Sequence, residues 1–248
     1  MTISKTAWKK YITILEKIDK QAATIIKNYI SRTGTQNLDS ERFTDFIYSV
    51  TAKYGDAAAA VAAQFYDEIV TAEGLFLPAA ELADGASYEE VKAALKGTLK
   101  TSQNANSISG MATRLIKQQG QDTMLKNGIR DRAEFAWIPS GDTCAFCLTL
   151  ASNGWRPISK EALKGGHAEH IHANCNCAYA IRHKETTNYA SYNPQEYKEI
   201  YDEAEGSTGQ EKINYIRRRQ YAENKDKINA QHREAYRLRK EAEEEKEA

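Results

Sequence analysis

All four cysteines of this 248-residue chain lie within 34 residues, in two closely spaced pairs. The first pair is Cys144-x-x-Cys147 and the second is Cys175-x-Cys177. Residues 1–20 lack the apolar core of a secretory signal, so we expect a protein that is made and kept in a reducing cytoplasm. In that compartment, cysteines paired at such spacings indicate metal ligands rather than disulfides. The sequence therefore predicts that this stretch folds around a metal ion.

Three of the five histidines lie between the two cysteine pairs, in the segment His167-x-x-His170-x-His172. Structural zinc takes four thiolate or imidazole ligands in a tetrahedron, and here seven side chains compete for the four places. The expected ligands are Cys144, Cys147 and His172, with either Cys175 or Cys177. The alternative is that the cysteines are reduced, buried thiols beside incidental histidines.

Helical periodicity dominates the first 130 residues. Apolar side chains recur every three or four positions over residues 4–31, and Ser87-x-x-Glu90 is a capping box that opens a further helix. Gly55 is expected to end a second helix, and Asp56 to cap an alanine-rich third one. No strand is expected before residue 130. Residues 1–130 are therefore predicted to form an all-helical bundle.

The sequence pattern changes after residue 130, where short β-prone stretches at 135–138 and 178–181 flank the cysteines. We interpret residues 131–185 as a small, loop-rich metal-binding module. Residues 186–248 are predicted to be a helical basic arm, in which Thr208-x-x-Glu211 caps a long polar helix. The expected fold class is mainly α: a bundle, a zinc knuckle with short strands, and a long C-terminal helix.

The chain has 34 basic and 34 acidic residues, so no overall charge favours nucleic acid, membrane or acidic partners. It also lacks an apolar run long enough to span a bilayer, and no membrane partner is expected. Residues 212–240 differ from the whole, with ten Lys or Arg against three acids. The basic side chains that we consider for DNA contact are Arg217, Arg218, Arg219, Lys225, Lys227, Arg233 and Arg237.

Such an arm can neutralise the phosphates of double-stranded DNA without reading its bases. Alternatively, it is a solvated helix, or a coiled-coil arm that docks on a partner protein. The acidic end of the chain, residues 241–247, opposes DNA contact.

A catalytic zinc is a further alternative. The segment His167-Ala-Glu169 faintly matches the His-x-Glu of zinc deaminases, and a His-Asn-His nuclease would use His170 or His172 with Asn174. However, the Cys-x-x-Cys comes first in this chain, and neither enzyme's surrounding strands and helices are evident. Four good ligands favour a closed, structural site over one with Glu169 as a base.

The stretch from Trp137 to Cys177 resembles the Mu F-like phage head morphogenesis proteins, over about 45 residues. Those proteins place an Asp shortly before a Cys-x-x-Cys, as Asp142 stands here, and end in a His-x-x-Cys-x-Cys knuckle. Prolines usual around that knuckle are replaced by Ile171 and Ala173, and the additional histidines leave the ligand set open.

The resemblance implies a minor capsid protein that acts inside the phage head and occurs in the host cytoplasm during assembly. It implies portal and major capsid or scaffold proteins as partners, and a link to DNA packaging or ejection. We expect a structural role rather than an enzyme. The alternatives are a zinc-dependent nucleic-acid enzyme, nuclease or deaminase-like, and a cytoplasmic DNA-binding regulator.

Overall fold

The computed structural model describes residues 1–140, 143–158 and 177–247. This part of the chain is mainly helical, which confirms the predicted fold class at that level. Its elements are β1 (Thr2–Ile3), α1 (Lys5–Thr33), α2 (Glu41–Ala72), α3 (Tyr88–Thr101), α4 (Ala105–Arg130), β2 (Glu134–Ile138), α5 (Ala145–Ala151), β3 (Arg156–Pro157), β4 (Ala178–Arg182), β5 (Asn188–Tyr189), α7 (Pro194–Asp202) and α8 (Gly209–Glu247).

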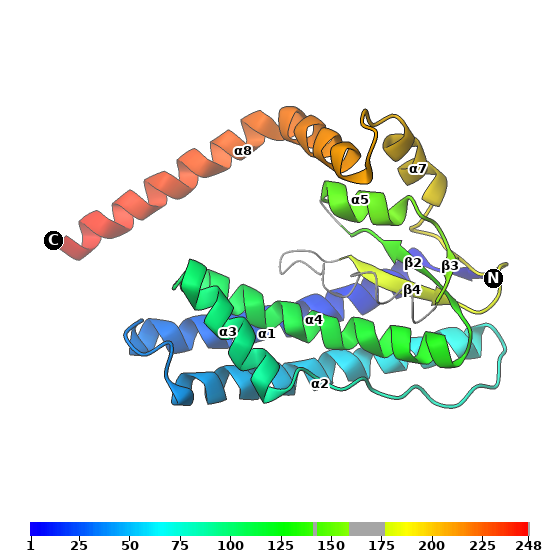
Figure 1. The fold of residues 1–248 in the computed structure, drawn as a ribbon, viewed down its shortest axis with the longest axis horizontal. Coiled ribbons are helices and arrows are strands. Elements are labelled where there is room, and N and C mark those ends of the chain that lie inside the picture. Colours follow the sequence, from blue (N-terminus) through cyan, green and yellow to red (C-terminus); the bar gives the residue numbers. More distant parts are fainter. Residues whose placement is uncertain (141–142, 159–176, 248) are drawn as a thin grey trace.

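The elements form successive layers, which Figure 1 shows from bottom to top. The long helices α1, α2 and α4 make a bundle, with α3 lying across it. A small sheet packs on one end of the bundle, α5 covers the sheet, and α7 with the start of α8 covers α5. The rest of α8 extends away from the body towards the C-terminus.

Local sequence signals explain most helix ends. Ser4 and Ser40 accept hydrogen bonds from the backbone amides of the first turns of α1 and α2. Ser87 and Glu90 form the predicted capping box of α3. Gly34, with a φ of 74°, ends α1, since a side chain would strain that backbone.

The predicted break at Gly55 is wrong, because α2 is one continuous helix from Glu41 to Ala72. Gly55 lies inside the helix, against the side chain of Gln119 on α4. A Cβ added at Gly55 would lie 2.1 Å from Gln119 Oε1. The glycine therefore makes room for a buried amide and does not end a helix.

The backbones of α2 and α4 approach each other at Gly120. An added Cβ at Gly120 of α4 would lie 3.4 Å from the carbonyl oxygen of Ala58 and 3.5 Å from its Cβ. Ala58 and Ala62 of α2 are buried, whereas Ala60 faces solvent. Small side chains along this seam let the two helix backbones approach each other, as the alanine-rich sequence suggests.

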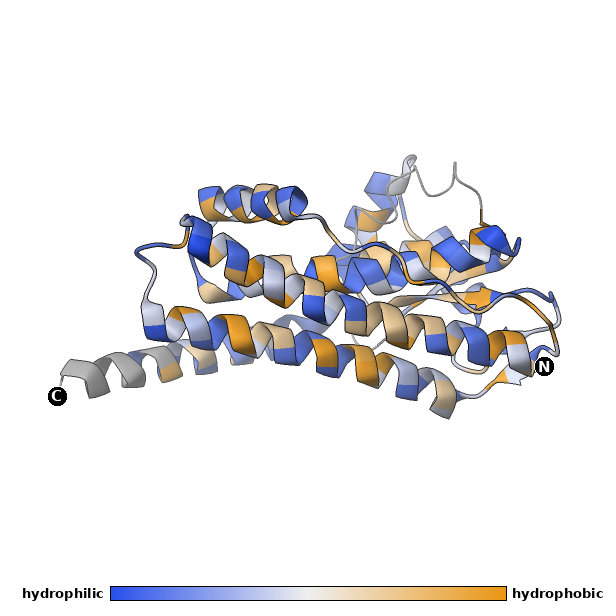
Figure 2. Ribbon diagram, turned by 90° about the horizontal axis from the view of Figure 1, so that it is seen from below, coloured by the Kyte–Doolittle hydropathy of each residue, from blue (hydrophilic) through white to orange (hydrophobic). Residues whose placement is uncertain are grey.

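An extended segment, residues 75–87, follows α2 along the bundle (Figure 2). Polar side chains of α4 hold it in place. Asn127 accepts from the Glu81 amide at 2.9 Å and donates to the Glu81 carbonyl at 2.8 Å. One helical turn earlier, Thr123 accepts from the Ala83 amide at 3.0 Å. These side chains satisfy the backbone of a segment that has no partner strand.

The sheet has the order β3-β2-β4 and is antiparallel, with Glu134 opposite Arg182 and Ile138 opposite Ala178. Its two longer strands confirm the predicted β-prone stretches. The expectation of no strand before residue 130 is wrong, because β1 pairs in parallel with β5. The helix α5, directly after Cys144, was not expected in a loop-rich module.

Sheet and bundle share one apolar core. It contains Trp8 and Phe65 from the bundle, Ile138 and Ile181 from the sheet, and Cys147 from α5. Among the described helices, none carries an apolar stretch of the length that crossing a membrane requires.

The close α2–α4 seam predicts a position-specific effect of enlarging alanine. Ala58→Leu adds three carbon atoms against the backbone of Gly120 and should lower the free energy of unfolding by ~1–3 kcal/mol. Ala60→Leu, an exposed change on the same helix, should stay within ~0.5 kcal/mol of the wild type. Chemical denaturation of both variants measures this, and equal stabilities would contradict the packing described here.

Candidate functional site

The first cysteine pair lies at the start of α5. Cys144 is the N-cap residue and is exposed, and Cys147 lies one turn later and is buried in the core shared with the sheet. The Cys147 amide donates to the Cys144 sulfur at 3.5 Å. The helix therefore holds the two sulfurs one turn apart, a different local structure from the loop expected for Cys-x-x-Cys.

Cys177 enters the sheet from the other side of the gap in the described chain. It directly precedes β4, whose first residue, Ala178, pairs with the last residue of β2, Ile138. The chain leaves β2 at this same end and reaches Cys144 six residues after Ile138. The sheet therefore brings Cys177 to the end from which α5 starts, although 30 residues separate Cys147 from Cys177.

The other expected ligands, His172 and Cys175, lie outside the described residues, as do His167, Glu169 and His170. Among residues 1–140, 143–158 and 177–247, no three His, Cys, Asp or Glu side chains form a group that could hold a metal ion. The described cysteines alone thus do not make a metal site, and the predicted zinc knuckle remains a prediction.

A groove of about 610 Å³ opens beside Cys144. Thr143, Cys144 and Leu148 line it on the side of α5, and Arg217, Gln220 and Lys227 line it on the side of α8. Gln220 Nε2 donates to the carbonyl of Thr143 at 2.9 Å and ties the two sides together. The exposed cysteine therefore faces a groove of mixed character, which two cationic side chains and the acid Glu223 line.

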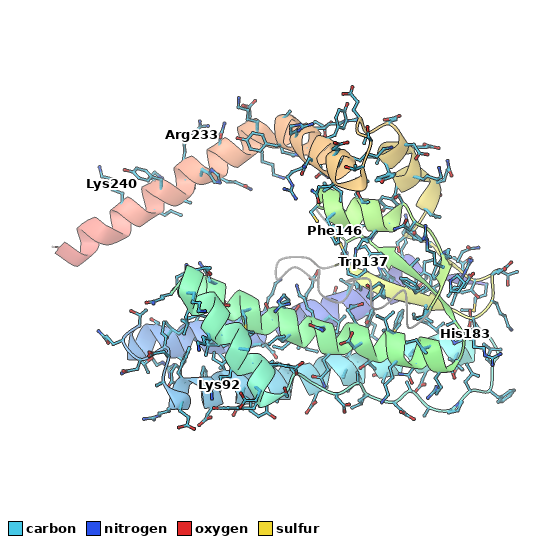
Figure 3. The ribbon with its side chains drawn as sticks, in the orientation of Figure 1. Lys92, Trp137, Phe146, His183, Arg233 and Lys240 are labelled. Atoms are coloured by element: carbon cyan, nitrogen blue, oxygen red, sulfur yellow. The ribbon has the colours of Figure 1, made fainter. Side chains whose placement is uncertain are left out.

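The basic arm is α8, and only its beginning is packed on the body. Ile216 is buried against Ala145 and Leu148 of α5. From Tyr221 onwards the described side chains are almost all exposed, and Figure 3 shows Arg233 and Lys240 on the extended part. The predicted long polar helix is thus confirmed.

All seven basic residues proposed for DNA contact are exposed on α8. At about 100° per residue they occupy all sides of the helix rather than one face. Arg219 pairs with Glu203 and Glu223, and Arg237 pairs with Glu234. A straight duplex beside α8 would therefore reach only some of them.

A buried polar cluster, which the sequence did not predict, lies where α2, α4 and β4 end. His183 Nδ1 is 2.7 Å from Glu73 Oε2, and His183 Nε2 is 2.9 Å from the hydroxyl of Tyr66. Tyr66 donates to Asp131 at 2.8 Å, and Arg130 binds the same carboxylate through two nitrogens. We call these five residues the Glu73–His183 cluster; His183 appears in Figure 3.

The cluster fixes the charge of its two carboxylates. Burial alone would raise the pKa of Glu73, but hydrogen bonds from His183 outweigh it, and the pKa of Glu73 is lowered. Asp131 also has a lowered pKa, because hydrogen bonds from Arg130 and Tyr66 outweigh its burial. Both ring nitrogens of His183 have a polar partner within hydrogen-bonding distance, Nδ1 at Glu73 and Nε2 at the Tyr66 hydroxyl.

One sequence signal could have pointed to this cluster. Glu73 is the C-cap residue of α2, where the helix dipole disfavours a negative charge. A buried acid at that place needs specific donors, and the backbone amides of His183 and Lys184 together with the ring of His183 supply them. Nothing in the sequence around His183 indicated which histidine would be the partner.

The fold and the site together define a mainly helical protein, with a small antiparallel sheet that positions cysteines beside a basic helical arm. A family model of the VG15 protein matches residues 2–204, which is most of the chain. The chain belongs to this family, a viral or phage gene family. No curated protein matches the chain, and no solved structure does.

The Glu73–His183 cluster predicts a defined pH dependence. Because both carboxylates have lowered pKa values in the folded state, their contribution is present above pH ~4, their unfolded range, and is lost as the pH falls below it. Glu73→Gln should cost ~1–3 kcal/mol of unfolding free energy at neutral pH, because the amide nitrogen cannot accept the hydrogen bonds that the carboxylate accepts from the backbone amides of His183 and Lys184.

The difference between wild type and Glu73→Gln should shrink on acidification below pH ~4, measured by urea unfolding at several pH values. Glu68→Gln, an exposed change on the same helix, should behave as the wild type does. A difference that does not vary with pH would show that Glu73 acts through packing and not through its charge.

Proposed function

We propose that this chain is a non-enzymatic minor head protein of a phage particle, similar to the Mu F-like head morphogenesis proteins. The observation that carries the proposal is the VG15 match, which covers the bundle and the whole cysteine-containing region. A viral family and the knuckle pattern at Asp142, Cys144 and Cys147 support the same conclusion from two directions. The protein would act inside the head, after a period in the host cytoplasm during assembly.

In this proposal each structural layer has its own role. The bundle would dock on portal and major capsid or scaffold proteins. The cysteine-containing region would be a structural staple, and α8 would reach towards the portal or packaged double-stranded DNA. The seven exposed basic residues of α8 support contact with phosphates without base reading, on whichever sides of the helix a duplex can reach.

We further propose that zinc is the staple's metal. Cys144 and Cys147, one turn apart, and His172 would hold it with Cys175 or Cys177. Cysteine and histidine are the donors that structural zinc prefers, and the position of Cys177 at the end of β2 and β4 supports a shared site. When bound, zinc would link the start of α5 to the end of the sheet, and its binding free energy would add to folding stability.

Metal analysis of the purified full-length protein tests the zinc proposal. We expect about one zinc ion per chain, and a loss of most of it in Cys147→Ser. Cys175→Ser and Cys177→Ser, compared side by side, should identify the fourth ligand, because only the ligand's loss lowers the zinc content. His232→Ala on the exposed arm is the matched control and should retain the metal. Well under one zinc per wild-type chain would exclude the staple.

Purified particles of the virus that encodes the chain test the proposed function itself. The protein should sediment with heads and resist external protease until the heads are opened. Glu169→Ala should assemble normal particles, because no catalytic base is required for a structural role. A protein found only outside particles, or particles that fail with Glu169→Ala while still containing zinc, would favour the enzyme or regulator alternatives.

A further inference from the structure

The outward face of α1 carries six positive charges. The six exposed lysines of this helix are Lys5, Lys9, Lys10, Lys17, Lys20 and Lys27. At about 100° per residue they fall within an arc of about 140°, opposite the side that buries Trp8, Ile18 and Ile26. The helix forms one edge of the bundle, so this arc is open to solvent (Figure 2). We call this arc the α1 lysine face.

Negative charge is nearly absent from the α1 lysine face. The helix has only two acids, Glu16 and Asp19. Asp19 turns inward to Lys117 of α4, 3.5 Å away, and burial raises its pKa to about 6. Glu16 lies within the arc, about 20° from its edge at Lys5, and is only partly exposed. The face therefore has a local excess of about five positive charges in a chain whose formal net charge is zero.

The lysines of this face also differ from other exposed basic residues in how they are paired. In the described part of the chain, no ion pair includes any of the six. Elsewhere, Lys198 pairs with Asp202 and Arg219 with Glu223, each one turn along its helix. Solvent-exposed helix faces usually mix the two signs in this way, because like charges repel. The α1 lysine face repels itself, and a polyanion would relieve that repulsion.

The size and composition of the face favour one kind of polyanion. Lys5 and Lys27 are separated by about 33 Å along the helix axis, close to one turn of B-form DNA. Between the lysines stand uncharged hydrogen-bonding side chains such as Thr13, Gln21 and Thr24. Lysine, threonine and glutamine are residue types that contact phosphates.

Other classes of partner fit the face less well. A protein interface needs buried apolar or aromatic anchors, and a membrane surface needs an apolar helix face to insert. The large apolar side chains nearest to the α1 lysine face are Ile14, which is partly buried, and Ile25, which is 38% exposed, and both lie beyond its margin.

We propose that the α1 lysine face binds the phosphate backbone of double-stranded DNA without reading its sequence. This surface is separate from α8 and does not depend on the zinc site or on the proposed role in the head. It differs from α8 in a way that affects binding: its charges share one side of a helix, whereas those of α8 surround theirs. Flexible lysine ammonium groups act as point charges on phosphates, which suits binding without a fixed register.

Binding of the full-length protein to a random-sequence duplex, measured by fluorescence anisotropy across a salt series, tests the proposal. The test variant is the triple change Lys9→Gln, Lys17→Gln and Lys20→Gln. If each lysine contacts a phosphate, the slope of log affinity against log salt should become shallower by about 0.9 per contact, so by about 2–3 for the triple variant. Affinity in low salt should fall about tenfold or more.

The matched control is the triple change Lys92→Gln, Lys96→Gln and Lys100→Gln, which removes the same charge from exposed positions of α3. It should retain the wild-type slope. The three lysines changed in each variant are exposed. The unfolding free energy of both variants should therefore stay within about 0.5 kcal/mol per substitution of the wild-type value. A third variant, Arg233→Gln with Arg237→Gln, reports the contribution of α8 separately.

Three results would overturn the proposal: equal losses in the two lysine variants, a wild-type slope in the α1 variant, or no salt-sensitive binding by the wild type. The same would follow if the α1 variant lost binding to phosphatidylserine vesicles, or lost self-association, while its DNA binding stayed intact. Incorporation of the protein into phage particles is measured in a separate experiment from DNA binding. A failure of the α1 lysine face therefore leaves the proposed head function standing, and the reverse is also true.

Discussion

The close contact between α2 and α4 determines where almost everything else in the molecule lies. Ala58 and Gly120 let the two backbones approach, and Gly55 makes room for the amide of Gln119. Three residues connect the end of α4 to β2, so the position of α4 sets the position of the sheet. The sheet in turn places Cys177 at the end from which α5 starts. Side chains of methyl size or smaller in the bundle therefore control the geometry of a site well outside it.

Polar contacts then fix how the packed elements are positioned along one another. The segment 75–87 is fixed on α4 by Thr123 and Asn127, which bond to specific backbone groups rather than to any apolar surface. At the end of the bundle, the Glu73–His183 cluster joins α2, α4 and β4 through directional bonds. Apolar helices can slide along one another with little change in buried area, whereas a buried carboxylate without its donors is costly.

Much of the fold followed from local sequence rules, because those rules act over one or two helical turns. The caps at Ser87 and Thr208 and the two longer strands lie where the sequence placed them. The helix end predicted at Gly55 was wrong because glycine is a common helix-end signal in a sequence. Only the tertiary contact with Gln119 explains why a glycine stands inside α2. The helix α5 was missed because it is short and begins at a cysteine that was interpreted only as a ligand.

The sequence identified which cysteines to consider as a candidate site, but not how the fold arranges them. Spacing alone singled out Cys144 and Cys147, but the placement of Cys177 at the same end of the sheet depends on strand pairing across a long separation. The Glu73–His183 cluster joins residues 110 positions apart, and no local pattern announces such a pair. The buried polar side chains of α4 were equally hidden, since apolar periodicity says nothing about a helix that is enclosed on several sides.

The anchoring of α8 at only one end has a mechanical consequence. Beyond Tyr221 the helix runs for about 40 Å without support from the body, so it behaves as a cantilever fixed at Ile216 and Gln220. A tilt of about 10° at the fixed end would move the tip by about 7 Å, while hardly disturbing α5. A partner that binds the C-terminal end of α8 can therefore transmit force along the helix to the start of α5, where Cys144 lies.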